Sequence, residues 1–169
     1  MKHLKKIAVA IVLFVATTGF VNAQTKVAHI SVQELLSGMP EMIAANNELK
    51  KLQETYGADI ESSMAELKNK YTQYSNESAS KTKEENEKRS IELQGFEKSI
   101  AEVQQAAQKD IQKKQMELYG PITEKAKKAI EKVAAAQGFD YVMDASPGGG
   151  LIVSNGKNLL ADVKKELGF

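Results

Sequence analysis

Apolar residues recur every three or four positions along two long stretches of the chain, and a polar segment separates the two stretches. In the first stretch these positions begin at Leu49, and in the second they begin at Leu93. This spacing places the apolar side chains on one face of a gently supercoiled helix. The pattern therefore predicts two long helices, at residues 41–76 and 82–119.

The polar segment, residues 75–90, contains Ala79 as its only apolar residue. Its first half is a candidate turn, and the run Thr82-Lys83-Glu84-Glu85 forms a capping box that can start the second helix. At 1.5 Å per residue each long helix would extend about 55 Å. Because the two lengths match, we predict an antiparallel coiled-coil hairpin, here called the arm.

Shorter elements precede the arm. Residues 26–30, "KVAHI", alternate polar and apolar side chains as a half-buried strand does. Ser31 and Glu34 form a second capping box, which predicts a short helix that ends near Gly38. Pro40 can open the first arm helix, because the first turn of a helix leaves its amide unused.

The C-terminal part of the chain predicts a helix, a hairpin and a last helix. An interior proline removes a helical hydrogen bond, so Gly120-Pro121 should end the second arm helix, and a separate helix should follow at residues 122–137. Residues 139–156, "FDYVMDASPGGGLIVSNG", predict a β-hairpin whose glycines form the turn. Asn158 can cap a final helix at residues 159–167.

The predicted fold is mainly α, with a small β-barrel-like oligomerisation head from which the long antiparallel arm projects. Residues 24–40 and 121–169 form the head, and residues 41–120 form the arm. Three short strands in so small a unit are marginally stable alone, and their free edges can pair with another chain. We therefore expect oligomerisation through the head.

The N-terminal segment, residues 1–23, has the composition of a secretory signal peptide. Lysines precede an apolar run from Ile7 to Val15, and small residues lead to Ala23. A membrane-spanning helix needs about 20 apolar residues, whereas Gly19 and the threonines before it interrupt this run. The segment predicts cleavage after Ala23 and a soluble periplasmic protein.

Charge and cysteine content exclude further classes of protein. The chain has 23 basic and 22 acidic residues, and loss of three lysines with the leader leaves 20 against 22, a formal charge near −2. A strongly basic face is typical of nucleic-acid binding, so no nucleic-acid partner is expected. Without cysteine the chain has no disulfide and no lipidated cysteine for a membrane anchor.

No catalytic, cofactor or metal site is predicted. His29 is the only histidine after the leader, and no cysteine, second histidine or carboxylate motif lies near it in the sequence. Ser31, Ser37 and Ser154 lie outside the contexts that activate a serine nucleophile. The "PGGG" run lacks the lysine and the helix start of a phosphate loop. An enzyme would depend on His29 or on an unrecognised carboxylate pair, for which Asp144 is the residue to test.

Side chains of the arm are the candidates for binding a client protein. The seam residues mainly pack the two helices, while methionine and tyrosine also make adaptable contacts with many partners. Apolar residues away from the seam are a second source of contacts. The candidates are Met42, Tyr56, Met64, Tyr71, Tyr74, Ile91, Phe96 and Met116. Contact of the charge-rich arm tip with a membrane surface has weaker support, because mixed charge is typical of a solvated face.

The order of elements and two short blocks resemble the Skp (OmpH-like) periplasmic chaperone family. The blocks are "VAHIS" at residues 27–31 and "AAAQGFDYVMDAS" at residues 134–146. The resemblance covers essentially the whole chain after the leader. It implies three subunits whose strands join in a small β-barrel head, and three arms around a cavity that holds unfolded outer-membrane proteins without ATP.

Carried over to this chain, the resemblance places residues 26–30, 139–144 and 151–154 in the trimer head. The implied head residues are Val27, His29, Ile30, Tyr141, Val142, Met143, Leu151, Ile152 and Val153. The best-known members are distinctly basic, which suits long-range attraction of acidic clients, and this chain departs from them. The leading hypothesis is a cofactor-free holdase that works through many weak contacts. The alternative is a coiled-coil spacer or adaptor that links components of the cell envelope.

Overall fold

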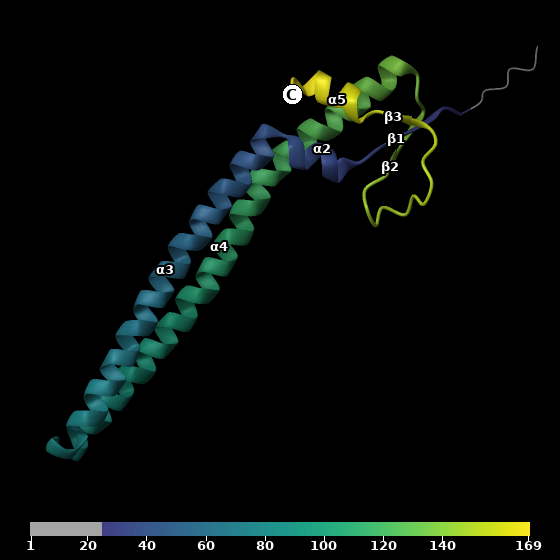
Figure 1. Ribbon diagram of the computed structural model, residues 1–169. Coiled ribbons are helices and arrows are strands. Elements are labelled where there is room, and N and C mark those ends of the chain that lie inside the picture. The colour runs from purple at the N-terminus through teal and green to yellow at the C-terminus, as the bar shows by residue number, and fades with distance from the viewer. Residues whose placement is uncertain (1–24) are drawn as a thin grey trace, which may run out of the picture.

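The computed structural model describes residues 25–169, and the predicted leader lies outside the described residues. Two long helices form the arm, and a small sheet with short helices forms the head at one end (Figure 1). The elements in chain order are β1 (Val27–Ile30), α2 (Val32–Gly38), α3 (Pro40–Glu77), the 3₁₀ turn η1 (Ser78–Ser80), α4 (Lys83–Gln137), β2 (Tyr141–Asp144), β3 (Lys157–Asn158) and α5 (Leu160–Leu167). The predicted fold class is confirmed, although the sheet of the single chain is open.

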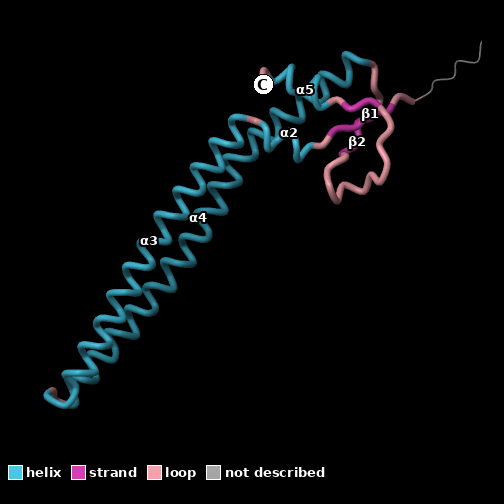
Figure 2. The backbone as a smooth tube through the Cα atoms, viewed as in Figure 1, coloured by secondary structure: helices cyan, strands magenta, loops and turns pink. Residues whose placement is uncertain are grey.

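The arm begins and turns where the sequence predicts. Pro40 occupies the first turn of α3. At the tip, the Thr82 hydroxyl accepts a hydrogen bond from the Glu85 amide at 3.2 Å, and the Glu85 carboxylate accepts one from the Thr82 amide at 2.8 Å. This reciprocal capping box satisfies two amides that the start of a helix would otherwise leave unpaired. From the tip, α4 runs back to the head alongside α3 (Figure 2).

The predicted break at Gly120-Pro121 is wrong, because α4 continues through it. An interior proline costs about 3 kcal/mol, since it removes one helical hydrogen bond and crowds the preceding turn. Tertiary packing outweighs this local cost, because the segment beyond the proline buries Ile122 and Ala126 in the core of the head. The helix ends instead at Gly138, whose φ of 69° is the left-handed conformation that favours glycine.

The sheet has β1 in its centre, and β1 pairs in parallel with both β2 and β3. Val27 lies opposite Tyr141, and His29 lies opposite Met143 in the β1–β2 pair. Opposite residues of paired strands point to the same face of a sheet. The register therefore gathers these four side chains on one face.

The predicted β-hairpin at residues 139–156 is wrong. Its first strand exists as β2, but residues 151–154 form no strand. The Asp144 carboxylate accepts hydrogen bonds from the amides of Val32 and Ser146 at 3.2 and 2.9 Å, which ties the end of β2 to the chain that follows β1. A turn does form at the glycines, but the chain continues past β2 and pairs with the opposite edge of β1.

The core of the head lies between one face of the sheet and the helices α2, α4 and α5. The largest fully buried side chains in the described chain are Ile30, Leu35, Met39, Leu159 and Val163. Met42 and Ala45 at the start of α3 pack against the same core. The head thus holds the base of both arm helices, and the rest of the arm extends away from it as a thin two-helix structure.

Candidate functional site

Tyrosines of α3 link the two arm helices through their hydroxyl groups. The hydroxyl of Tyr56 donates to Asp110 at 2.8 Å, and that of Tyr71 donates to Glu97 at 2.8 Å. These hydrogen bonds to carboxylates are the main cause that raises the pKa of both tyrosines above 10.0. Two of the candidate client-binding residues therefore already hold the arm together through their polar ends.

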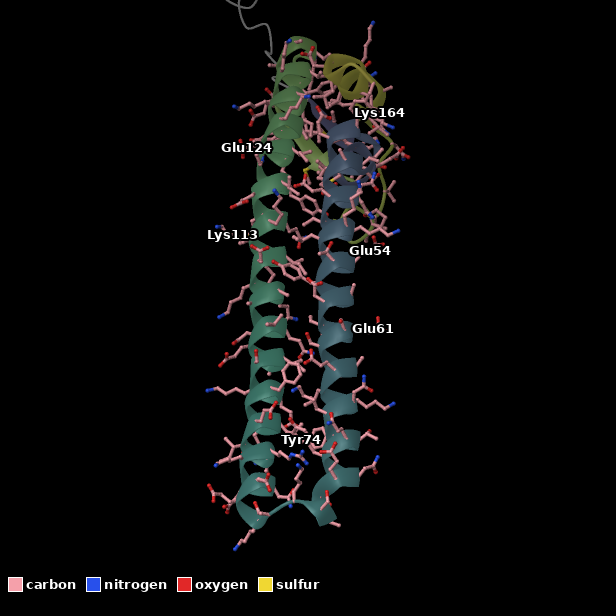
Figure 3. The ribbon with its side chains drawn as sticks, turned by 90° about the vertical axis from the view of Figure 1, so that its left-hand side faces the viewer. Glu54, Glu61, Tyr74, Lys113, Glu124 and Lys164 are labelled. Atoms are coloured by element: carbon pink, nitrogen blue, oxygen red, sulfur yellow. The ribbon has the colours of Figure 1, made fainter. Side chains whose placement is uncertain are left out.

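A network of polar groups closes the tip of the arm. Tyr74 lies between the two helices (Figure 3) and donates to Glu92 at 2.7 Å. Arg89 stacks over the ring of Tyr74, with its central carbon 4.5 Å from the ring centroid, and its Nη2 lies 2.5 Å from Glu77. The hydrogen bond from Gln73, followed by the one from Arg89, lowers the pKa of Glu77. Near the tip these polar contacts between α3 and α4 add to the packing of the helices.

The seam of α3 follows the predicted positions except at Met64 and Tyr71. Ser63 and Lys70 lie half-buried at the positions that face α4, so Met64 and Tyr71 lie one residue away from the seam. The side chain of Met64 is 54% exposed and that of Tyr71 is 44% exposed. Both are therefore accessible to a partner, although the sequence pattern assigned them to helix packing.

The remaining arm candidates fall into three groups by exposure. Ile91 is 67% exposed and Met116 is 70% exposed, so both lie open on α4. Tyr56, Tyr74 and Phe96 are half-buried in the seam. Met42 is buried in the core of the head and offers no surface to a client in this conformation.

The arm also carries a groove that the sequence reasoning missed. It lies between α3 and α4 near the middle of the arm, has a volume of about 790 Å³, and continues along α3 into a second hollow of about 600 Å³. We call it the arm groove and define it by Gly57, Ile60, Met64, Ala101, Gln104 and Gln108. The signal in the sequence was Gly57, a glycine inside a helical pattern, which lowers helix stability.

The outer face of the sheet in the head is apolar and uncovered. Val27, Tyr141 and Met143 share this face and are exposed, with Tyr141 at 62%. His29 lies on the same face and is half-buried. Ile30 and Val142, the other implied head residues of β1 and β2, lie toward α4 instead, with Ile30 buried and Val142 half-buried.

The loop after β2 carries a second exposed apolar segment. Leu151 is half-buried, Val153 is exposed and Ile152 is 97% exposed. A groove of about 520 Å³ lies beside β2, between that strand and the base of α4. Phe139, Ile130 and Ala134 contribute to its lining. The head therefore offers both an extended apolar segment and an apolar groove.

The described residues contain no arrangement for metal chemistry or for spanning a membrane. Among residues 25–169, no cluster of three or more histidine or acidic side chains could hold a metal ion. Within the same range, no helix combines the length and apolar content that a membrane crossing requires.

Comparisons with known proteins agree on one family. Residues 26–167 match the family described as outer membrane protein (OmpH-like). A protein from Pectobacterium atrosepticum named chaperone protein Skp is 22% identical over 155 residues, which cover 92% of this chain and 93% of that protein. The crystal structure of an OmpH-like outer membrane chaperone from Caulobacter crescentus has a TM-score of 0.74 at 16% identity, covering 86% of this chain and 85% of that one.

Proposed function

Because the chain belongs to the OmpH-like outer membrane protein family, a family of chaperones rather than enzymes, we propose that it is an ATP-independent holdase. Its clients are unfolded outer-membrane proteins, which it holds in a cavity between the arms of a trimer. The observation that carries this proposal is the surface of the arm, where the apolar side chains of Met64, Ile91 and Met116 are exposed. Scattered apolar contacts of this kind each bind weakly and together give avidity.

In this proposal residues 24–40 and 121–169 form the trimer head, and residues 41–120 form the arm. The uncovered face with Val27, Tyr141 and Met143 supports assembly, because exposed contiguous apolar surface marks interaction sites. In a single head only one face of the sheet packs against a core. Contact with two further copies would bury these side chains and cover the second face.

Strand pairing between copies supports the same assembly. β2 is an edge strand, since its only partner in the described chain is β1. Residues 151–153 form a continuous apolar run followed by Ser154, and residues 151–154 are unpaired within the sheet. Such a segment suits a strand that is buried on both faces. We therefore assign residues 151–154 of one copy to the free edge of β2 in the next copy, beside the groove at Phe139 and Ile130.

The location follows from the predicted leader and from the clients. Removal of residues 1–23 by cleavage after Ala23 leaves a chain that acts in the periplasm, where outer-membrane proteins travel unfolded. Holding requires no reaction and no cofactor, because release needs only the reversal of weak contacts. No nucleic-acid partner belongs to this function, and contact with a membrane surface is not required by it.

The function is tested by diluting a urea-unfolded outer-membrane barrel into buffer with the purified chain from Gln24 onward. We expect suppression of light scattering from aggregates near one trimer per client. A folded protein that leaves the aggregation unchanged would refute the holdase. Recovery of one stable folded partner, with no affinity for unfolded barrels, would favour an envelope adaptor instead.

The trimer is tested by introducing a charge into the uncovered sheet face. Tyr141→Lys should leave a single head folded, because this side chain is exposed there, and should lower the mass in light scattering from three chains to one. Ile91→Lys places the same charge on an equally exposed apolar position of the arm and should keep the mass of three chains. A monomeric parent protein would contradict the assembly.

A further inference from the structure

Small residues from both helices contribute to the lining of the arm groove. A Cβ added at Gly57 would meet no atom within 4 Å, so no packing contact requires glycine there. Its backbone is also helical, within α3, where glycine is less favourable than alanine. Ala101 faces the same hollow from α4. Gly57 therefore leaves the surface of α3 open at this point of the groove.

Glutamine amides border this open floor. Gln53 lines it from α3, while Gln104, Gln105 and Gln108 line it from α4. All four side chains are exposed, and none has a hydrogen-bond partner in the part of the chain that the structure describes. Each amide offers two donors and one acceptor with two lone pairs. The groove therefore combines an apolar floor with uncommitted, uncharged hydrogen-bonding groups.

The charge around the groove is balanced. Lys98 and Glu102 lie at one end, and their charged atoms are 3.8 Å apart, so each neutralises the other. Glu61 and Lys68 border the hollow along α3 in the same one-to-one ratio. A groove for an anionic or cationic ligand would show an excess of the opposite charge. This one fits an uncharged ligand.

The spacing of the glutamines matches an extended polypeptide. Gln104 and Gln108 are four residues apart, which places them about 6 Å apart along the helix. Backbone groups on one side of an extended chain repeat every two residues, or about 6.6 Å. Strands of membrane barrels alternate apolar and polar side chains, so one face of such a segment suits the floor at Ile60 and Met64.

We propose that the arm groove binds an extended segment of an unfolded outer-membrane barrel, with the apolar face of the segment on Gly57, Ile60 and Met64 and its backbone hydrogen-bonded to Gln104 and Gln108. This proposal rests on the holdase function and assigns its contact site. Recognition of backbone amides and carbonyls is independent of sequence, which explains how one surface can hold many clients.

The test measures affinity for a urea-unfolded outer-membrane barrel that contains tryptophan. The chain has no tryptophan, so the emission of the client alone reports binding. Gly57→Leu fills the floor of the groove and should raise the dissociation constant about tenfold. Gly95→Leu is the matched control, because Gly95 is also inside an arm helix with open space around it but lies outside the groove. Leucine favours helix more than glycine does, so both variants should fold.

The amides are tested separately with Gln104→Met and Gln108→Met, which keep the size of the side chain and remove its hydrogen bonds. We expect affinity to fall about fivefold for each amide removed. Unchanged or tighter binding by the double variant would overturn backbone recognition.

Placement of the client is tested by cross-linking. Because the chain has no cysteine, Gln105→Cys can carry a single photoreactive label beside the groove. Lys113→Cys carries the same label on the outward face of α4 (Figure 3). Only the first label should cross-link the client. Equal cross-linking, or equal affinity of Gly57→Leu and Gly95→Leu, would overturn the site, whereas failure of the parent protein to bind any unfolded barrel would refute the holdase itself.

Discussion

Pro121→Ala should stabilise the protein substantially. Pro121 is exposed inside α4, so its ring makes no buried contact that alanine would lose. The missing amide leaves the carbonyl of Glu117 without its helical partner, and the ring crowds the same turn. Alanine restores the hydrogen bond and removes the clash, which together are worth about 3 kcal/mol.

Thermal unfolding followed by far-ultraviolet circular dichroism measures this gain. For a chain of this size 3 kcal/mol corresponds to a rise in Tm on the order of 10 °C. Protein concentration must be held constant, because assembly makes Tm depend on concentration. Gly120→Ala, at the neighbouring exposed position, should add only about 1 kcal/mol, and Gly95→Ala should match it.

An unchanged or lower Tm for Pro121→Ala would refute the reasoning about α4. It would mean that a new helix begins at Pro121, where proline is tolerated because the first amides of a helix have no partner. The glycine variants separate this outcome from a general effect of added helix propensity, because they alter no hydrogen bond.

The remaining predictions concern the tip, the core and acid pH. Thr82→Ala removes the hydroxyl of the capping box and should lower stability to urea by about 1 kcal/mol, while Thr72→Ala, within α3, should change it little. Leu35→Ala opens a cavity at a fully buried position and should cost about 2–5 kcal/mol in the same urea titration; a smaller loss would mean that the head core is loosely packed. The hydrogen bond from the Ser146 hydroxyl, with further bonds from backbone amides, lowers the pKa of Asp144 below 3.8. A lowered pKa in the folded state gives stability that is present above 3.8 and is lost as pH falls through the folded value. Asp144→Asn should therefore flatten the fall of Tm below pH 4, and an unchanged pH profile would contradict this role.

The long helices were predictable because their signal is local and repeated. A seam of apolar residues at steps of three and four identifies a helix wherever it persists. Two positions of the α3 seam, Met64 and Tyr71, were assigned one residue away from the observed seam. Lys70 lies in the seam of the arm and donates to Glu92 at 2.7 Å, so a polar residue takes a position that hydrophobicity assigns to its neighbour Tyr71. At this position a polar pair between the two helices takes the place of an apolar contact.

The hairpin and the helix break failed for a different reason, since both depend on contacts with distant residues. A strand pattern does not state its partner, and β1 lies far upstream of β2 in the chain. The two edges of β1 pair with β2 and β3, and residues 151–154 therefore stay outside the sheet of the single chain. Likewise, the core contacts of Ile122 and Ala126 hold a helix that local rules would end at Pro121.

The groove was hidden for the opposite reason, because Gly57 and the glutamines that border it are exposed residues outside the seam. Its glutamine side chains make no hydrogen bond within the described chain, and a Cβ at Gly57 would meet no atom within 4 Å. Residues that stabilise a fold can be inferred from periodicity, whereas residues that meet a partner stand out only where they depart from it. The stability of this protein resides in the head core, the seam and the cross-helix pairs. Substitution of Gly57 and the glutamines should therefore change binding while the arm stays folded, and this separation makes the proposed client site open to a direct test.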